Sequence, residues 1–554
     1  MDSTALRVVP LGGLGEIGKN MTALRQASGM ILIDAGLSFP DEEMPGIDLV
    51  LPDFTYVREH ASELRGVFLT HGHEDHVGAL PYLLREFPEV PVYGTRLTLE
   101  LVRPKLREFG IKNAELREVR PGERVDTAGY TLEFIHVNHS IPDAVAIAAH
   151  TAAGLVVFSG DYKIDLTPIE GGTTDLSRLA ALGSQGVLAY FGDSTNSERP
   201  GYVPSERVVS NALRDIFDEA PGRIIVASFA SHLHRIGQVV EAAKLHDRLI
   251  AVTGRSMVRN VQIARDLGYL NIPASMMVEQ HEINNIPDRD LVILTTGSQG
   301  EPLSALSRIA NETHKTIRVR QDDTVIIAAH PIPGNERKVS RVINDLMKRG
   351  ADVHYSPLKP VHVSGHAAQE EQKIMLSLLK PRYLVPVHGE YRHLRHHFNT
   401  AVSMGFPTER IFLLENGSQL EFRAGEARRL QNVPAGMFLI DGASFGDTAS
   451  DVVVRERQQL SADGMFVVVA RINAQSGELL GAPDVISRGF VYMRDADGLL
   501  QEAIEVVSST LQETARHHIT DWGELKNSIR RDLSRFLADR TGKRPIILPL
   551  IVEV

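Results

Sequence analysis

The densest group of chemically capable residues is the segment Thr70–Gly78, which reads THGHEDHVG. Five imidazole or carboxylate side chains fall within six positions, at His71, His73, Glu74, Asp75 and His76. In a tight turn, His71 and His73 can point the same way, while Asp75 and His76 face a second centre beside the first. Neutral imidazole and carboxylate suit Zn²⁺ and Mn²⁺. The alternative is a polar surface loop, which so high a density of ligand groups disfavours.

The composition limits what such a site could be. The 554 residues include no cysteine, so a metal must be held by histidine, aspartate or glutamate. A net charge of −11 argues against a uniformly basic nucleic-acid-binding surface but leaves room for a local groove. No apolar run approaches the ~20 residues that span a bilayer, and the N-terminus MDSTALRVVPLGG lacks the pattern of a secretory signal. We therefore expect a cytoplasmic globular protein without membrane association.

The elements that must position these side chains are short buried strands. Apolar runs that end in a polar residue or glycine are typical of such strands, and they occur at 7–10, 30–34, 67–70, 131–137, 155–159 and 187–191. Polar residues that could do chemistry follow the ends of these runs, at Asp34, His71, His139, Asp161 and Asp193. We expect the strand ends to deliver these side chains to one region.

The pattern changes along the chain in a way that predicts an insertion. From 205 to 356, helical stretches alternate with strands at 223–228, 249–253, 291–296 and 324–329, which indicates a parallel α/β unit. The first pattern resumes with RYLVPV and His388. The stretch EFRAGEARRLQNVP is polar and turn-rich, and the last hundred residues run strand, strand, helix, helix, strand. We predict a first domain in two parts, at 1–204 and 357–420, with an inserted domain at 205–356 between them. A linker at 421–445 and a C-terminal α+β domain at 446–554 follow.

A glycine-rich stretch near the N-terminus is a decoy. Gly13–Gly18 fits the G-x-G-x-x-G pattern of dinucleotide-binding sites, which requires a helix directly afterwards. Here Lys19–Gln26 leads quickly into Gly29 and the run MILID. The sequence favours a strand–turn–strand hairpin.

Two further clusters have the composition of a phosphate-binding pocket. Hydroxyls, imidazoles and backbone N–H groups beside glycine can surround a phosphate. They occur at Ser231, His232, Leu233 and His234, and again at His362, Val363, Ser364, Gly365 and His366. A structural histidine is the alternative for each one alone, but the pair favours a pocket. Basic residues at Lys315, Arg318, Arg320, Arg337, Lys338 and Arg341 could guide a nucleic-acid backbone, although a solvated helix face explains them nearly as well.

The motif H-x-H-x-D-H at His71–His76 resembles that of the metallo-β-lactamase superfamily, and further residues follow in that superfamily's order. The resemblance implies a first metal on His71, His73 and His139. It implies a second on Asp75, His76 and His388, with Asp161 bridging the two. Asp34 would support the site without binding metal.

The insertion resembles a β-CASP domain, which is associated with nucleic-acid cleavage. Asp193 in FGDSTN matches motif A of that group, His366 in HVSGHA matches motif B, and His388 matches motif C. DNA-directed members tend to have valine at the last position, so His388 favours RNA. Within the group, LGGLGEIGKN, NHSIPDA, ASFASHLHR, HPIPGNE and PVHGEYRHL resemble the RNase J family, and the similarity spans the chain. His330 departs from the small residue expected there.

The resemblance implies a fold and a function. The fold would be α/β: a metallo-β-lactamase αββα sandwich with an inserted β-CASP parallel α/β domain and a small C-terminal α+β domain. The function would be that of a ribonuclease with two divalent ions, Zn²⁺ or Mn²⁺, acting in RNA maturation and decay. It would be a 5′→3′ exonuclease preferring single-stranded RNA with a 5′-monophosphate, with additional endonuclease activity.

Roles within the site follow from the same resemblance and from side-chain chemistry. Asp75, His76 and Asp161 would act at the ions. His366 would protonate the leaving 3′ oxygen or steady the phosphate, since imidazole can do either near neutral pH. Asp34 and Asp193 would orient ligands through hydrogen bonds. We expect a homodimer or homotetramer, with RNA-degradation proteins as further partners.

Two other functions remain open at this point. A small-ester or thioester hydrolase on the same metal scaffold predicts no large insertion and no phosphate-binding histidines. An inactive scaffold for an RNA-processing assembly predicts lost ligands, and none is missing. The sequence distinguishes neither Zn²⁺ from Mn²⁺ nor exonuclease from endonuclease preference.

Overall fold

The computed structural model describes residues 2–41, 43–301, 303–332, 334–442, 451–473, 478–490, 496–517, 519 and 521–554. They form two compact units, one of Met1–Phe39 with Val50–Phe438 and one of Pro40–Leu49 with Leu439–Val554. The boundary predicted at 445/446 lies outside the described residues, the one at 420/421 is corrected below, and those at 204/205 and 356/357 stay predictions. In the part of the chain that the structure describes, every helix is too short or too polar to cross a bilayer.

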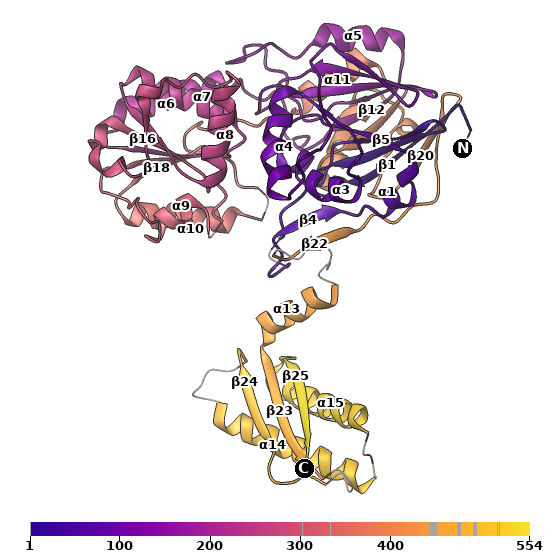
Figure 1. Ribbon diagram of the computed structural model, residues 1–554, viewed down its shortest axis with the longest axis vertical. Coiled ribbons are helices and arrows are strands. Elements are labelled where there is room, and N and C mark those ends of the chain that lie inside the picture. The colour runs from indigo at the N-terminus through magenta and orange to yellow at the C-terminus, as the bar shows by residue number, and fades with distance from the viewer. Residues whose placement is uncertain are drawn as a thin grey trace. The chain divides into compact units, whose positions relative to one another are not determined.

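Two β-sheets packed face to face form the core of the larger unit (Figure 1). Their orders are β21-β20-β1-β2-β3-β5-β6-β7 and β19-β12-β11-β10-β9-β8. The interior between them is filled by apolar side chains of both sheets, such as Phe68, Phe134 and Phe158. The strands are β1 (Ala5–Gly12), β2 (Met21–Gln26), β3 (Gly29–Ile33), β5 (Leu64–Phe68), β6 (Val92–Gly94), β7 (Leu116–Glu118), β8 (Arg124–Thr127), β9 (Tyr130–His136), β10 (Val145–Thr151), β11 (Gly154–Phe158), β12 (Val187–Asp193), β19 (Tyr383–Val387), β20 (Leu420–Arg423) and β21 (Glu426–Arg429).

Helices cover the outer faces of this sandwich. Helix α4 (Arg96–Glu108) buries one apolar side and packs against β6 and β7. Helices α5 (Leu176–Gln185), α11 (Gln369–Leu379) and α12 (Tyr391–Ser403) pack on the second sheet. This arrangement and the family matches reported below confirm the expected αββα fold. The remaining elements here are β4 (Leu49–Pro52), α1 (Thr55–Glu59), α2 (Glu74–Val77), α3 (Leu80–Glu86) and β22 (Met437–Ile440).

A third sheet lies between two segments of the sandwich in the sequence, and all its strands are parallel. Its order is β15-β14-β16-β13-β17-β18. Helices cover both faces, and the central strands β14, β16 and β13 are almost wholly apolar, as is usual for a parallel sheet buried on both sides. The expected parallel α/β insertion is confirmed. Its elements are α6 (Arg207–Glu219), β13 (Ile224–Ala227), α7 (Leu233–Leu245), β14 (Leu249–Val252), α8 (Arg255–Asp266), β15 (Met277–Val278), β16 (Leu291–Thr295), α9 (Ala305–Ala310), β17 (Thr324–Ile327), α10 (Glu336–Lys348) and β18 (Asp352–Tyr355).

The expected linker is wrong over its first residues. Strands β20 and β21 form a hairpin that extends the first sheet. Leu420 and Phe422 face the core, while Glu421 between them pairs with Arg7 of β1 at 3.1 Å. An outer strand exposes charged side chains along its length, and this polarity misled the sequence-based reading.

The glycine-rich N-terminal stretch is the turn of a hairpin, as predicted. Strands β1 and β2 pair antiparallel, and the glycines lie between them. Gly13 and Gly18 have φ of 89° and 101°, a region that glycine enters without steric cost. No helix begins there, so the dinucleotide-binding reading is excluded.

The smaller unit has a three-stranded sheet in the order β24-β23-β25. Two long helices cover one face, where Phe466 and Val468 meet Val507 and Leu533. The opposite face exposes apolar side chains at Ile486, Leu548, Leu550 and Val552. Strand, strand, helix, helix, strand was the predicted order, and an additional helix precedes it. The elements are α13 (Asp451–Asp463), β23 (Met465–Ile472), β24 (Asp484–Arg488), α14 (Ala496–Arg516), α15 (Trp522–Thr541) and β25 (Ile546–Glu553).

Candidate metal centre

The sandwich strands bring the candidate ligands together at their carboxyl ends. His71, His139 and Asp161 follow β5, β9 and β11 within a few residues, and His388 follows β19 directly. Asp34 and His388 have left-handed backbones, with φ of 59° and 53°. A non-glycine residue pays about 1–3 kcal/mol for a sparsely populated conformation of this kind, which persists where the surroundings demand it. At both positions, the fold holds a non-glycine residue in this conformation beside the candidate ligands.

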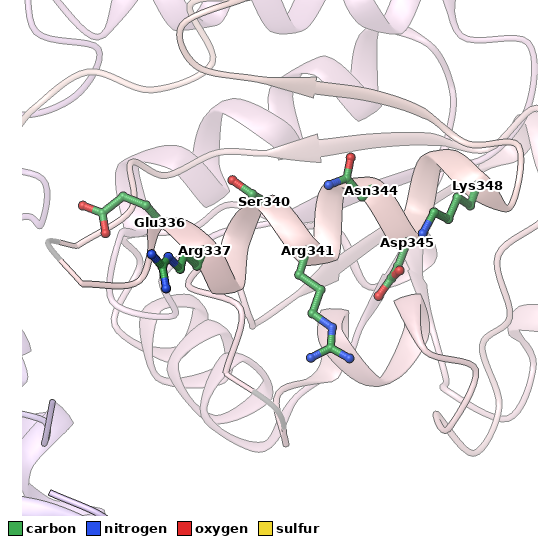
Figure 2. A pocket seen from close by; sticks show the side chains of 7 residues that line it. All are labelled: Glu336, Arg337, Ser340, Arg341, Asn344, Asp345 and Lys348. Atoms are coloured by element: carbon green, nitrogen blue, oxygen red, sulfur yellow. The ribbon is translucent and has the colours of Figure 1, made fainter. Parts of the chain in front are cut away.

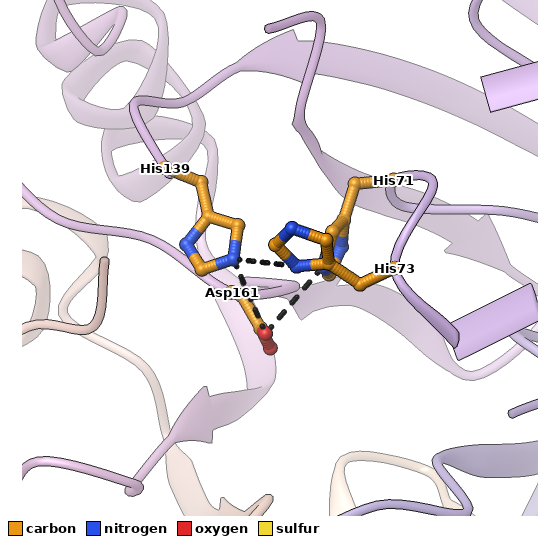
Figure 3. Close-up of side chains that lie close together, drawn as sticks. All are labelled: His71, His73, His139 and Asp161. Atoms are coloured by element: carbon orange, nitrogen blue, oxygen red, sulfur yellow. Dashed lines mark hydrogen bonds and ion pairs between the residues drawn. The ribbon is translucent and has the colours of Figure 1, made fainter. Parts of the chain in front are cut away.

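Three imidazoles and one carboxylate form a first cluster (Figure 3). His73 Nδ1 lies 3.0 Å from His71 Nε2 and 3.1 Å from His139 Nε2. The carboxylate of Asp161 completes the group, with Oδ2 3.5 Å from His71 Nε2 and 3.6 Å from His139 Nε2. These ligand atoms all lie within 4.8 Å of one another, as one metal ion requires.

Hydrogen bonds behind the imidazoles decide which nitrogens face the centre unprotonated. His139 Nδ1 donates to the carbonyl of Gly365 at 2.8 Å, so a neutral ring turns the lone pair of Nε2 inward. Thr70 Oγ1 donates to Asp34 Oδ2 at 2.9 Å and lies 3.0 Å from His71 Nδ1. That ring nitrogen is therefore the donor, and His71 Nε2 also presents a lone pair.

The electrostatics of this cluster keep its rings neutral. Burial lowers the pKa of His71 and His139 well below the usual value, and it lowers the pKa of His73 to about 4. Three lone pairs that converge at about 3 Å repel one another unless a cation lies between them. The donor set therefore fits a divalent metal ion.

A second cluster shares Asp161 with the first and consists of Asp75, His76, Asp161 and His388. His76 Nδ1 donates to Asp34 Oδ2 at 2.7 Å, which leaves its Nε2 3.2 Å from Asp161 Oδ1. His388 Nδ1 lies 2.7 Å from Asp161 Oδ1, and its Nε2 lies 3.4 Å from Asp75 Oδ2. That buried Nε2 has no hydrogen-bond partner among the described residues.

The second cluster holds an excess of negative charge. Burial lowers the pKa of His388, but Asp161, Asp75 and Asp193 outweigh it and raise that pKa to about 10. The same balance, with Asp161, Asp34 and Asp75, raises the pKa of His76 well above its usual value. The carboxylates here favour a positive charge beside them, and a second divalent cation would supply it.

Asp193 and His366 lie beside these clusters. His366 Nδ1 is 2.8 Å from Asp193 Oδ2 and 3.9 Å from Asp161 Oδ2. Its ring stacks edge-on against His139 and His388, with centroids 5.1 and 5.4 Å away. The structure thus places Asp34 and Asp193, the two expected supporting carboxylates, each against a histidine of the site.

The two predicted pocket segments lie against the first cluster. The carbonyl of Gly365 binds His139, and a Cβ added to Gly365 would come within 2.7 Å of that ring, so only glycine fits. His362 stands 6.0 Å from His232 and 4.7 Å from His330, measured between ring centroids. Buried His232 Nε2 and His362 Nδ1 have no hydrogen-bond partner in the described part of the chain.

Other site residues escaped the sequence-based reading. Asn20 Nδ2 lies 3.1 Å from His76 Nε2 and 3.2 Å from the carbonyl of Asp75. Thr70 binds Asp34 through both its backbone N–H and its hydroxyl. A threonine two residues after β5 carries no specific signal, whereas Asn20 was visible as a polar residue ending a glycine-rich turn.

Four of the six basic residues proposed to guide RNA have two kinds of surroundings. Arg320 pairs with Asp288, and Arg318 bonds to the carbonyl of His314, so both have structural partners. Figure 2 shows the exposed side of α10, where a surface hollow of about 520 Å³ is lined by Glu336, Arg337, Ser340, Arg341, Asn344, Asp345 and Lys348. Acidic and basic groups alternate there, which favours a solvated helix face.

Known families match the chain along its length. The profile of the metallo-beta-lactamase superfamily matches residues 14–173, and that of the Ribonuclease J beta-CASP domain matches 221–346. A Zn-dependent metallo-hydrolase RNA specificity domain matches 350–410, and the Ribonuclease J C-terminal domain matches 452–554. The matches lie in the order of the domains that the sequence predicted.

Individual relatives are similar over nearly the whole chain. The chain is 42% identical to Ribonuclease J2 of Bacillus subtilis, over 99% of both chains. It is 40% identical to Ribonuclease J of Thermus thermophilus, over 99% of this chain and 95% of the relative, and 41% identical to that of Synechocystis, over 99% and 86%. A solved structure described as a protein of unknown function from Enterococcus faecalis shares the fold alone. Its TM-score is 0.50 at 16% identity, over 77% of this chain and all of the other.

Proposed function

The chain belongs to the ribonuclease J family and is a metal-dependent ribonuclease, and from this premise we propose that it degrades RNA from the 5′ end. The proposed activity is that of a 5′→3′ exonuclease preferring 5′-monophosphate ends, with additional internal cleavage, in RNA maturation and decay. One observation carries it: the segment that holds His139 through Gly365 also holds His362 and Ser364 of the predicted pocket. A bound 5′ end would thus lie beside the reacting bond.

We assign one ion to His71, His73 and His139, and a second to Asp75, His76 and His388, with Asp161 between them. Zn²⁺ and Mn²⁺ both suit this donor set. When bound, such ions lower the pKa of a coordinated water toward ~7 and neutralise charge on the scissile phosphate. Asp34 holds the ring of His76 so that Nε2 faces the second cluster.

His366 is the proposed proton donor. Its Nδ1–H donates to Asp193 at 2.8 Å, so Nε2 remains to hold a proton for the leaving 3′ oxygen or to bind the phosphate. Burial lowers the pKa of His366, but Asp193 and Asp161 outweigh it and raise that pKa above its usual value. The two carboxylates thus favour the protonated form of the ring.

The proposed 5′-phosphate pocket is formed by the two segments predicted for it. Imidazole, hydroxyl and backbone N–H groups would surround the phosphate, contributed by Ser231, His232, Leu233, His234, His362, Val363, Ser364, Gly365 and His366. A pocket that closes on one phosphate excludes the bulk and charge of a triphosphate. Preference for 5′-monophosphate follows from that exclusion.

The test compares RNAs of one sequence that carry a 5′-monophosphate, a 5′-triphosphate or a 5′-hydroxyl. We expect mononucleotide release to be fastest from the monophosphate. Ser364→Ala should reduce this preference about tenfold, the effect of losing one hydrogen bond to a charged group. Ser403→Ala is the matched control, because the Ser403 hydroxyl donates to the carbonyl of Thr400 in the last turn of α12. Equal exonucleolytic rates on all three RNAs would refute the pocket.

We also propose assembly into a homodimer or homotetramer in the cytoplasm, alone or with other RNA-degradation proteins. The open face of the small unit's sheet supports this, since exposed apolar patches mark interaction surfaces. The proposed substrate is RNA. A cytoplasmic location is consistent with the absence of cysteine, because the chain needs no oxidising compartment to form disulfides.

A further inference from the structure

A buried carboxylate, Glu206, lies between the segments of the metal centre and those of the proposed pocket. It directly precedes α6 and is 2% exposed. Its Oε1 is 3.2 Å from Lys163 Nζ, and its Oε2 is 2.8 Å from Arg235 Nη2. Both cations are also buried, and Lys163 Nζ lies 3.9 Å from a second buried carboxylate, Asp165 Oδ2.

Each of the two basic residues, Lys163 and Arg235, is also connected to the segments of one of the two sites. Lys163 follows Asp161 by two residues, and its backbone N–H donates at 2.8 Å to the carbonyl of Asn138, directly before His139. Arg235 lies in the first turn of α7, directly after His234, and donates through Nη1 to the carbonyl of Val361, directly before His362. The network therefore reaches two metal-ligand segments and both pocket segments.

Further contacts fix Glu206 itself and the ring of His232. The backbone N–H of Glu206 donates to Asp165 Oδ2 at 3.1 Å, and its carbonyl accepts from Gln238 Nε2 at 2.7 Å. His232 Nδ1 accepts from a backbone N–H of α7 at 3.2 Å, so the neutral ring carries its proton on Nε2. That atom lies 4.0 Å from Glu206 Oε1, on the side of the carboxylate.

Such a network is a costly means of stabilising a fold. Burying each ion costs several kcal/mol, and apolar side chains of similar volume often stabilise a protein as well or better. Buried hydrogen-bonded charges instead fix the relative positions of the groups that they join, because each contact admits only one geometry. Here the contacts fix the positions of the first turn of α7 and of the segment 361–366 relative to Lys163.

We infer that Glu206 is a positioning residue that holds the 5′-phosphate pocket in register with the metal centre. It acts through Lys163 on one side and Arg235 on the other, and it does not touch the substrate. The inference rests on the proposed function, because it requires that the pocket bind a 5′ phosphate. A fixed register sets how far from the 5′ end the chain cuts.

The test uses Glu206→Gln in the full chain, which keeps the shape of the side chain and removes its charge. Glu370→Gln is the matched control, because Glu370 is a partly exposed residue of α11 that pairs with Lys373 at 2.7 Å. Affinities are measured in the presence of a metal chelator, for RNA oligomers that differ only in having a 5′-monophosphate or a 5′-hydroxyl. With metal restored, hydrolysis of bis(p-nitrophenyl) phosphate reports on the metal centre without needing a 5′ end.

We expect the unmodified chain and the Glu370→Gln control to bind the 5′-monophosphate RNA at least about tenfold more tightly than the 5′-hydroxyl RNA. A difference in affinity of about tenfold is what one good charged contact contributes. Glu206→Gln should reduce this preference about fivefold or more, because Arg235 loses its carboxylate partner and Lys163 loses the nearer of its two. Affinity for the 5′-hydroxyl RNA and hydrolysis of the small diester should change no more than about twofold, a difference below ~0.5 kcal/mol.

Two results would overturn the inference. One is an unchanged preference in Glu206→Gln. The other is an equal loss of both RNA affinities and of diester hydrolysis, which would mean that Glu206 only maintains the fold. If Glu206→Gln does not fold, Gln238→Leu, which removes an amide that contacts Glu206 and Arg235, should lower the preference about threefold; no change would again contradict it. If the unmodified chain has no preference, the proposed function fails and the inference with it.

Discussion

At the scale of single residues, the chemistry depends on hydrogen bonds that set which nitrogen of each imidazole is free. Asp34 binds both Thr70 and His76, and through them it orients a ring of each cluster. The sequence identified Asp34 by its place after an apolar run, but not this double role. Thr70 could not be predicted, because a threonine at a strand end has many ordinary reasons to be there.

Asp75→Asn should abolish RNA hydrolysis, because it removes a charged ligand candidate from the second cluster. We expect a loss of at least about a thousandfold, with the melting temperature nearly unchanged, since Asp75 lies at the surface end of the site. Glu74→Gln is the matched control, because its carboxylate points to Lys105 instead. Turnover, metal content and thermal unfolding are measured together. Near-normal turnover in a metal-loaded Asp75→Asn chain would remove Asp75 from the site.

At the scale of elements, periodicity predicted the strands well and their outer neighbours poorly. The runs at 30–34, 155–159 and 187–191 became β3, β11 and β12 within a few residues, because strands buried on both faces are apolar throughout. The hairpin of β20 and β21 was missed because a sheet edge has a charged side. The insertion was predictable because a change of pattern that later reverses requires an interrupted domain.

A pH prediction belongs to β9, whose Glu133 is buried between two arginines. Burial raises the pKa of Glu133, but hydrogen bonds from Arg178 and Arg124 outweigh it and hold that pKa below 4.5. The stabilisation is therefore complete above pH 4.5 and disappears as the pH falls through the folded-state pKa. Glu133→Gln should lower the free energy of unfolding by about 2 kcal/mol at neutral pH.

The measurement is chemical denaturation of both proteins at pH 7 and at about pH 3, where the difference should be smaller. Glu115→Gln is the control, because Glu115 also bonds an arginine but is exposed. A difference that stays constant across this range would show that the carboxylate's charge is not what stabilises β9.

At the scale of the whole molecule, the sheet of the small unit exposes apolar side chains on the face opposite its two helices. Leu550→Asp on β25 should lower the mass measured by light scattering, because a buried charge opposes a face-to-face contact. Hydrolysis of short RNA should be unaffected, since the candidate ligands all lie in the larger unit. Leu245→Asp, at the exposed end of α7, is the control. An unchanged mass would exclude this face from assembly.

The central claim, that two ions shared by seven side chains cleave RNA, is tested most directly by returning metal to the stripped protein. The metal-free chain is titrated with Mn²⁺ or Zn²⁺ while mononucleotide release from 5′-monophosphorylated RNA is followed. The account predicts no release without metal and a rise that levels off at two bound ions per chain. Release that persists without metal, or that is complete with one ion, would contradict it.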